Sequence, residues 1–354
     1  MPITKPVRFP SGVSGDSPSS INADFPQVLG RYQYNYLNTI ALARSTDFTS
    51  TIVGTGTVTN TAWPGGMMTI TNTAGAADAI TLGHKTQGMQ ILPGNRFWMN
   101  ATIAMPLSGV AQTMYLGGCD ATTFGAATNG IWLFKAAASS SLSLVIKNGA
   151  TTTTFTNIAD LSKTSGWVND TSAVAGTLAF NGTGTTFATV TVNNPGSGYQ
   201  VSPFVIPTGT AGSGAQVYCQ IGSGQLYAPY IAAAGSGYTA GTLGATILPL
   251  HNIALYYDGK GTLFVGVNGK TVISIGTYGA TSVTAGATVT NAAYNSYIVT
   301  NQLSTGVAPI QPRAGSFENL SALVPMFPSI ALVNTSAVAS TMYVNEIEFA
   351  GDLS

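Results

Sequence analysis

The stretch 252–275 predicts two consecutive β-hairpins, and this limits the folds open to the chain. Its sequence is NIALYYDGKGTLFVGVNGKTVISI, in which Asp258-Gly259 and Asn268-Gly269 separate three short apolar runs. Asp-Gly and Asn-Gly pairs adopt the positive φ angles that tight hairpin turns require. Between them, apolar residues alternate over 263–267, which is the period of a strand with one buried face. The stretch therefore predicts three antiparallel strands.

Most of the remaining chain also consists of short apolar runs separated by turn residues. Its 42 glycines and 17 prolines, with many Thr, Ser and Asn, separate short runs rich in β-branched and aromatic residues. This composition is typical of many short strands joined by turns. Only 31–45 has apolar residues at helical spacing, and it fits a strand equally well. The sequence predicts an all-β sandwich or barrel, closed by a strand pair at 329–349.

Charged residues are scarce in this chain. The 12 Lys and Arg balance 12 Asp and Glu, and together they are 7% of the residues, against about 25% in ordinary soluble proteins. Without net charge or charge runs, no field attracts nucleic acid or an anionic membrane. No apolar run reaches the roughly 18 residues of a spanning helix. We expect neither nucleic-acid nor membrane partners. We do expect other protein chains to cover much of a surface so poor in charge.

The four-residue motif GSGY occurs twice in the middle of the chain. NPGSGY at 194–199 returns as AAGSGY at 233–238, and each copy follows a strand-like run. Gly-Ser-Gly allows the backbone to reverse without a Cβ clash, and the tyrosine behind it can pack over the neighbouring hairpin. Two copies are too few for a long solenoid. We expect a compact β unit in which Tyr199 and Tyr238 pack on the hairpins of that unit and not on the sandwich.

These observations predict three parts. Residues 1–30 contain five prolines and three glycines, so they form an extended N-terminal arm. Residues 31–165 and 249–354 form the sandwich, and 166–248 form a small β domain inserted into it. The opening segment MPITKPVRFPSGVSGDSPSS lacks the apolar core of a secretion signal, so we expect synthesis in a cytoplasm.

No residue pattern predicts catalysis, a cofactor or a metal. Each of the two histidines, His84 and His251, stands without a nearby triad or metal-binding spacing, so both are interpreted as structural. Glu346 and Glu348 share one face of a strand, where two carboxylates could in principle cleave a glycosidic bond. The ordinary alternation of a half-buried strand explains them better. Asp258 belongs to its turn.

Other residues that could indicate a site have simpler interpretations. The two cysteines, Cys119 and Cys219, cannot form a disulfide framework for a chain of this size. Trp98, Trp132 and Phe134 are assigned to core packing. The glycine-rich stretches 212–214 and 222–224 lack the lysine and the following helix of a phosphate loop.

The hairpin sequence IALYYDG, TLFVGVNG and TVISI resembles the concanavalin A-like, or laminin-G-like, jelly roll. RFWMNATIAM, MYLGGCD, NGIWLFK and LSLVIKNGATTTTFTNI resemble, in order and spacing, central strands of such sandwiches in virion structural proteins of tailed bacteriophages. The resemblance covers about 48–165 and 250–350. The chain lacks the clustered Asp and Asn of calcium-binding legume-type lectins and the ExDxxE-like motif of glycoside hydrolases on this fold. As a neutral, charge-poor β protein with an extended N-terminal arm, it resembles a capsid decoration, or cement, protein of a tailed bacteriophage.

Three functions follow in order of preference. The resemblance implies a homotrimer on the outer surface of the phage head, where it bridges subunits of the major capsid protein. The alternative is a module of a tail or head fibre that binds host surface glycans through the insertion or an open sandwich face. An enzyme is the third class and would need a carboxylate pair in a cleft. The sequence has no heptad run that would predict a coiled-coil stalk. Because a tail spike usually has a stalk, this favours a position on the head surface.

Overall fold

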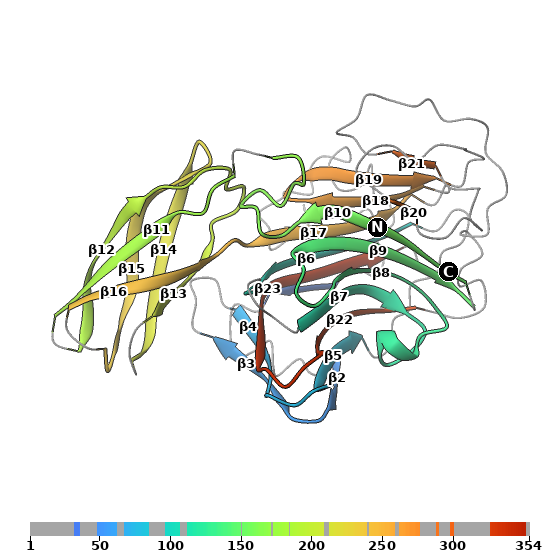
Figure 1. Cartoon of the computed structure of the whole chain (residues 1–354), viewed down its shortest axis with the longest axis horizontal. Coiled ribbons are helices and arrows are strands. Elements are labelled where there is room, and N and C mark those ends of the chain that lie inside the picture. The colour runs from blue at the N-terminus through green and yellow to red at the C-terminus, as the bar shows by residue number, and fades with distance from the viewer. Residues whose placement is uncertain are drawn as a thin grey trace, which may run out of the picture.

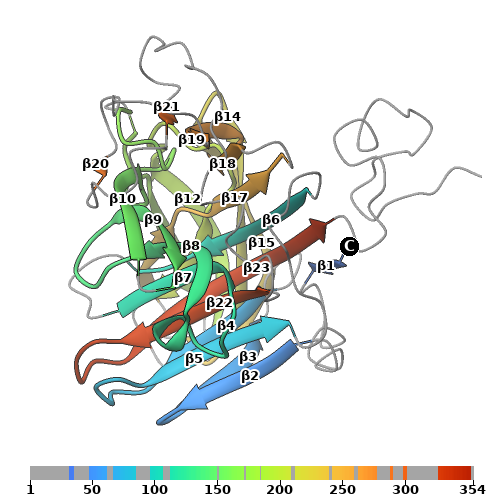
Figure 2. The same cartoon turned by 90° about the vertical axis from the view of Figure 1, so that its right-hand side faces the viewer.

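The computed structural model consists of β-strands joined by turns, with a short 3-10 helix, η1 (Phe124–Ala126). The strands form a two-sheet sandwich and a smaller lobe beside it (Figures 1 and 2). Within the described part, no helix is long and apolar enough to cross a membrane. The described residues are 32–35, 48–61, 67–84, 96–106, 112–149, 151–170, 173–183, 185–208, 212–238, 241–258, 262–276, 288–289, 298–300 and 326–351.

The first sheet of the sandwich has nine antiparallel strands. In spatial order they are β21 (Ile298–Thr300), β19 (Lys270–Gly276), β18 (Thr262–Val267), β17 (His251–Tyr257), β6 (Phe97–Ala104), β23 (Ser340–Gly351), β4 (Met67–Asn72) and β3 (Gly56–Thr61), with β1 (Tyr32–Asn35) paired to β23. Of the two alternatives for 31–45, the strand is correct over β1. Residues 36–45 and the expected arm at 1–30 lie outside the described residues.

The second sheet has eight antiparallel strands and faces the first. In spatial order they are β2 (Phe48–Val53), β5 (Ala79–His84), β22 (Phe327–Asn334), β7 (Gln112–Cys119), β8 (Asn129–Lys135), β9 (Ser141–Asn148), β10 (Thr151–Asp160) and β20 (Thr288–Val289). Strands adjacent in sequence, such as β4 and β5 or β22 and β23, lie in different sheets. The predicted all-β jelly-roll sandwich is confirmed.

The hairpins predicted at 252–275 are present. β17 pairs with β18, and β18 pairs with β19. Asn268 and Gly269 have φ angles of 51° and 77°, as their tight turn requires. The Asp258 carboxylate accepts a hydrogen bond of 2.9 Å from the Thr262 N–H, which agrees with its assignment to a turn.

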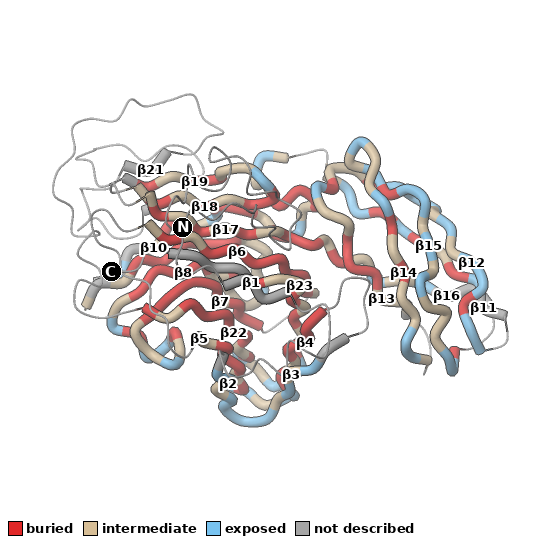
Figure 3. Tube along the Cα trace, turned by 180° about the vertical axis from the view of Figure 1, so that it is seen from behind, coloured by how far each residue is buried: buried red, intermediate tan, exposed pale blue. Residues whose placement is uncertain are grey.

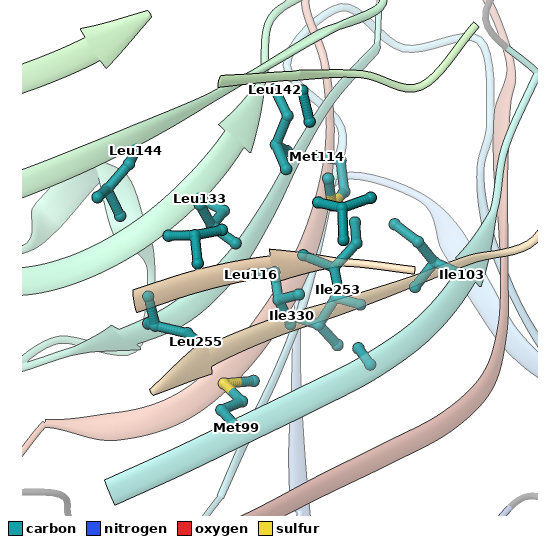
Figure 4. Packing of buried hydrophobic residues seen from close by; sticks show 14 of the residues in the cluster. Met99, Ile103, Met114, Leu116, Leu133, Leu142, Leu144, Ile253, Leu255 and Ile330 are labelled. Carbon is teal, nitrogen blue, oxygen red and sulfur yellow. The ribbon is translucent and has the colours of Figure 1, made fainter. Parts of the chain in front are cut away.

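The main core lies between the two sheets. β17 has alternate residues buried along its whole length, and Ile253 and Leu255 from this strand project toward Leu116 and Leu133 of the opposite sheet (Figure 4). Burial is densest in this layer (Figure 3). Because apolar burial stabilises a fold by about 25 cal/mol per Å², this cluster is the main source of the sandwich's stability.

The lobe consists of six strands from the middle of the chain. They are β11 (Thr177–Thr183), β12 (Thr186–Asn194), β13 (Phe204–Thr208), β14 (Ser213–Gly222), β15 (Gln225–Ser236) and β16 (Gly241–Leu248). One ladder runs β12-β11-β16-β13, and β14 and β15 form a second. β12 also lies against β15, and β13 against β14, so the strands form a ring around their own apolar cluster.

The two halves of the lobe are structural copies of each other. Tyr199 in the first GSGY motif and Tyr238 in the second are buried, and each hydroxyl accepts a hydrogen bond from the backbone at the start of the hairpin of its own half. The donors, Gly176 and Ala215, are separated in sequence by the same interval as the two motifs. Both tyrosines therefore pack within the lobe, as expected, and the sequence repeat corresponds to a structural duplication.

Glycine is required at matching turn positions of the two copies. Gly196 and Gly235 both have a φ angle of 64°. A Cβ at Gly196 would lie 2.5 Å from the Val174 carbonyl oxygen, and one at Gly235 would lie 2.6 Å from the Ser213 carbonyl oxygen. Val174 and Ser213 again differ by the repeat interval. The glycines allow each turn to approach the backbone of its own hairpin closely.

The lobe packs directly on the sandwich. Met67 and Ala104 belong to the lobe's apolar cluster, and the rings of Phe204 and Tyr343 lie 4.5 Å apart. Met68, in contrast, points into the main core. The proposed division at 166–248 stays a prediction, because these contacts leave open whether the two parts fold separately.

Candidate functional site

A pocket of about 340 Å³ lies on the outer face of the eight-stranded sheet. β2, β5 and β22 form its floor, and the loop between β7 and η1 forms one wall. Most of the lining residues have a hydroxyl or carboxylate side chain. They are Thr49, Thr51, Gly83, Asp120, Ala121, Thr122, Phe327 and Ser329.

Strand register brings the floor residues together. Thr49 of β2 lies opposite Gly83 of β5, which lies opposite Ser329 of β22. Cross-strand partners project to the same face, so this row points away from the main core. A Cβ at Gly83 would lie 3.0 Å from the Ser329 Oγ. Because Gly83 has no side chain, the pocket stays open above the middle of its floor, between the hydroxyl-bearing side chains of Thr49 and Ser329.

Asp120 is the carboxylate of this pocket, and its position is fixed by hydrogen bonds. Oδ1 accepts from the Thr128 N–H at 2.8 Å, and Oδ2 accepts from the Asn129 Nδ2 at 2.9 Å. Burial pushes the pKa of Asp120 up, but these hydrogen bonds outweigh it and hold the pKa below its ordinary value. The group is therefore an ionised, oriented acceptor at neutral pH.

An aromatic cluster lies beside the pocket on the same face. The rings of Tyr115 and Phe124 stack at 5.2 Å, and Phe124 meets Trp132 edge-on at 5.6 Å. Ala121 of the pocket wall packs against this cluster. A Cβ at Gly130 would lie 2.8 Å from the Trp132 ring, so glycine there leaves room for the indole.

The predicted core packing is confirmed for Trp132 and Phe134, but their core is this second cluster and not the layer between the two sheets. Trp132 and Phe134 alternate with the core residues Ile131 and Leu133, so they lie on the outer face of their sheet and form a satellite cluster. Trp98 likewise alternates with residues of the main core, on the other sheet. A period-two pattern identifies two faces but does not state which face is internal.

His251 is buried within a hydrogen-bond network. It is 3% exposed, its Nε2 lies 3.0 Å from the Leu161 carbonyl oxygen, and its Nδ1 lies 3.1 Å from the Asn268 Nδ2. Burial lowers its pKa to about 4. His84 ends β5, and its side chain lies outside the described residues.

The carboxylate pair of β23 lies away from the pocket. Glu346 is half-buried in a strand flanked by β6 on one edge and β1 on the other, while the side chain of Glu348 lies outside the described residues. Among the described residues, no three His, Cys, Asp or Glu side chains gather as a metal ion would need. Cys119 and Cys219 are both buried and free, and burial raises both thiol pKa values to about 11.

A buried lysine is a feature that the sequence did not reveal. The Lys135 side chain is fully buried, and its Nζ donates to the carbonyl oxygens of Gln112 at 3.2 Å and Ala136 at 3.1 Å. Desolvation lowers its pKa to about 8. It lies on the core side of β8, whereas the pocket lies on the outer face, so it is not part of the site.

The pocket residues themselves were also missed at the sequence level. Asp120 had no paired acid or motif to single it out. Thr49 and Ser329 lie near opposite ends of the chain, and only the pairing of β2, β5 and β22 brings them together. A small signal was present, because Asp120 directly follows the strand sequence MYLGGC and precedes a turn rich in small residues.

Comparisons with known proteins give remote structural likenesses. No family model and no curated protein sequence matches the chain. A protein of unknown function from Shewanella oneidensis MR-1 has 9% identity and a TM-score of 0.38, covering 96% of this chain and 95% of its own. The Emp46p carbohydrate recognition domain has 9% identity and a TM-score of 0.33, covering 90% and 95%.

A third likeness is to a conserved carbohydrate esterase from the Shiga toxin-encoding bacteriophage phi24B. It has 7% identity and a TM-score of 0.34, covering 92% of this chain and 98% of its own. With TM-scores below 0.5, these likenesses do not bear on function.

Proposed function

We propose that this chain is a non-enzymatic carbohydrate-binding protein whose sugar site is the pocket around Asp120. The observation that carries the proposal is that a carboxylate oriented by two hydrogen bonds lines the same pocket as three hydroxyl-bearing floor residues. Sugars present many hydroxyls in fixed directions, and a carboxylate that already accepts two protein hydrogen bonds can accept further ones from a ligand. Thr49, Thr51 and Ser329 can both donate and accept.

The size and shape of the pocket support a small ligand. A volume of about 340 Å³ lies at the lower end of ligand pockets, which suits one or two sugar rings. Half-buried Phe327 supplies an apolar surface for the C–H face of a ring. The pocket contains one carboxylate and no described cation, so neutral sugars are favoured over acidic ones.

Hydrolysis is not expected at this site. Glycoside cleavage needs two carboxyl groups about 5–10 Å apart, and Asp120 is the one carboxyl group in the described lining. Its lowered pKa also makes it a poor proton donor at neutral pH. The groups that line the pocket are therefore suited to binding a sugar and not to cleaving it.

Binding of neutral oligosaccharides to the full chain tests the proposal. Asp120→Asn removes the charge while keeping the shape, and it should weaken binding at least about tenfold, since charge-assisted hydrogen bonds contribute about 1.5–3 kcal/mol. Thr49→Val with Thr51→Val should weaken binding without disturbing the fold. Asp258→Asn is the matched control, because that carboxylate also accepts a backbone hydrogen bond in a turn and lies outside the pocket. Equal affinity in all variants, or no binding by the wild type, rejects the proposal.

The decoration role implied by the sequence resemblance is a second candidate. It is favoured by the lobe, which projects from the sandwich (Figure 1) and exposes an apolar side chain outside the β14–β15 hairpin, Val174, which is 53% exposed. Such surfaces suit contact with other protein subunits. In this proposal the chain lies on the outer capsid surface of a virion and contacts the major capsid protein. Purified chain should co-sediment with undecorated phage heads at a fixed ratio; failure to do so removes this candidate.

A further inference from the structure

The lobe has a surface without charge. From Thr171 to Leu250 the sequence contains no Asp, Glu, Lys, Arg or His. All six lobe strands lie within this stretch, and many of their residues are exposed (Figure 3). Every charged residue of the chain therefore lies outside the lobe strands.

Three tyrosines gather on one face of the β14–β15 hairpin, and we call them the tyrosine face: Tyr218, Tyr227 and Tyr230. Tyr218 lies directly opposite Tyr230, and Tyr227 lies opposite Gln220. Tyr218 alternates with the fully buried Val217 and Cys219; it is half-buried and packs in part against the apolar cluster of the lobe. Tyr227 is 48% exposed and Tyr230 is 59% exposed.

The duplication of the lobe provides an internal comparison for these tyrosines. At the equivalent positions, one repeat interval earlier in the sequence, the first copy has Ala179, Ala188 and Thr191. Ala179 lies opposite Thr191 just as Tyr218 lies opposite Tyr230. The same hairpin therefore forms with small residues at these positions. A strand pair of this kind therefore forms without these tyrosines, and the exposed rings of Tyr227 and Tyr230 need another explanation.

We propose that the tyrosine face binds a second copy of this chain, with two tyrosine faces packed about a two-fold axis. Charge complementarity carries the choice of occupant. Ordinary protein surfaces are rich in charge, and covering them with an uncharged lobe would desolvate those charges without compensation. The lobe of another copy is itself uncharged, so contact between the two lobes removes no charged group from water.

The residue types also fit a self-contact. Tyrosine is enriched and charge is depleted at the centres of protein interfaces, where the ring supplies contact area at a small entropic cost. An isologous contact needs only one self-complementary patch on each copy. The tyrosine face lies on the outside of a strand pair, whereas the proposed sugar site is the pocket around Asp120.

Sedimentation analysis of the full chain tests this proposal. The wild type should have the mass of two copies at micromolar concentration. Replacing the three tyrosines with their counterparts in the first copy, Tyr218→Ala, Tyr227→Ala and Tyr230→Thr, should give a monomer with unchanged circular dichroism. Tyr230→Glu alone should weaken association at least about tenfold, because it buries an unpaired charge. Thr191→Glu, at the equivalent position of the first copy, and Asp120→Asn in the pocket should leave the pair intact.

Salt provides an independent readout. An interface without charge should change its dissociation constant less than about twofold between 0.05 and 0.5 M NaCl, whereas contacts between charges weaken over this range. A monomeric wild type, or a pair that survives the triple substitution, overturns the proposal. A wild type with the mass of a trimer, which the phage resemblance implies, would also overturn the proposal. A monomer whose tyrosine face binds an oligosaccharide would assign the face to a sugar instead.

Discussion

His251 shows how one buried side chain holds the segment around Leu161 and Ser165 against the first sheet of the sandwich. The Leu161 carbonyl oxygen can only accept, so Nε2 carries the proton and Nδ1 accepts from the Asn268 amide. The same amide donates to the Ser165 carbonyl oxygen at 2.7 Å. This network requires the neutral imidazole, and burial lowers its pKa from 6.5 to about 4.

Acid should therefore weaken the fold through His251. Between about pH 4 and 6.5 the imidazole is neutral in the folded chain but protonated in the unfolded chain, so unfolding takes up a proton. The free energy of unfolding should fall as pH drops through this window, by roughly 3 kcal/mol in total, and level off below it. Urea titrations at several pH values measure the slope. His251→Gln should flatten it; a slope unchanged in that variant would assign the acid sensitivity to other groups.

At the scale of elements, the GSGY turn occurs twice in the lobe and makes equivalent hydrogen bonds in both places. In each copy the tyrosine N–H donates at 3.0 Å to the hairpin turn of the other copy, Tyr199 to Gly224 and Tyr238 to Thr185. The hydroxyl accepts from the tyrosine's own half. The tyrosines thus connect the two halves, which explains why a motif of only four residues fixes a six-stranded arrangement.

Removing the two tyrosine hydroxyls should have unequal effects. The Tyr199 hydroxyl accepts from Gly176 at 2.8 Å, while the Tyr238 hydroxyl accepts from Ala215 at 3.3 Å. Tyr199→Phe should lower the free energy of unfolding by about 1 kcal/mol, because a buried N–H loses its partner. Tyr238→Phe should cost less, since its hydrogen bond is longer. Thermal unfolding of both variants measures the difference, and an equal or reversed order would contradict it.

The sequence predicted those elements whose determinants are local. Asn268-Gly269 determines a hairpin because two adjacent residues carry the required φ angles, and the two GSGY copies were visible as a repeat. The partners of β6 were not predictable. It lies between β17 and β23, and both are distant from it in sequence. Apolar alternation specifies a buried face but no particular neighbour.

The same reasoning applies to the site. Asp120 and its hydrogen bonds to Thr128 and Asn129 are local, whereas the hydroxyl floor depends on three strands from distant parts of the chain. The sequence resemblance pointed to a sandwich, and a sandwich alone does not locate a pocket on either outer face. The site could therefore be recognised only after the register was known.

At the scale of the whole molecule, the segment that leads from the sandwich into the lobe packs on the sandwich. The Trp167 Nε1 donates to the Val267 carbonyl oxygen at 2.9 Å, and Lys270 Nζ lies 4.5 Å from the Trp167 ring centre. Residues 160–170 therefore pack on the sandwich, although they precede the first lobe strand. A shortened chain that lacks the lobe should keep them, which moves the cut from 166 to 171.

Replacing 171–248 with a short Gly-Ser linker should leave a folded sandwich that is less stable than the full chain. The main core lies between the two large sheets and remains complete, but the deletion uncovers Met67 and Tyr343, which the lobe contacts. Exposing such side chains costs about 1.5–3 kcal/mol each, so the free energy of unfolding should fall by about 3–6 kcal/mol. Met67→Thr with Tyr343→Thr in the shortened chain should reduce aggregation without changing the fold. The shortened chain should still bind sugar through the Asp120 pocket and should be monomeric, because the tyrosine face is gone. A shortened chain that fails to fold even with both substitutions would mean that lobe and sandwich form one cooperative core.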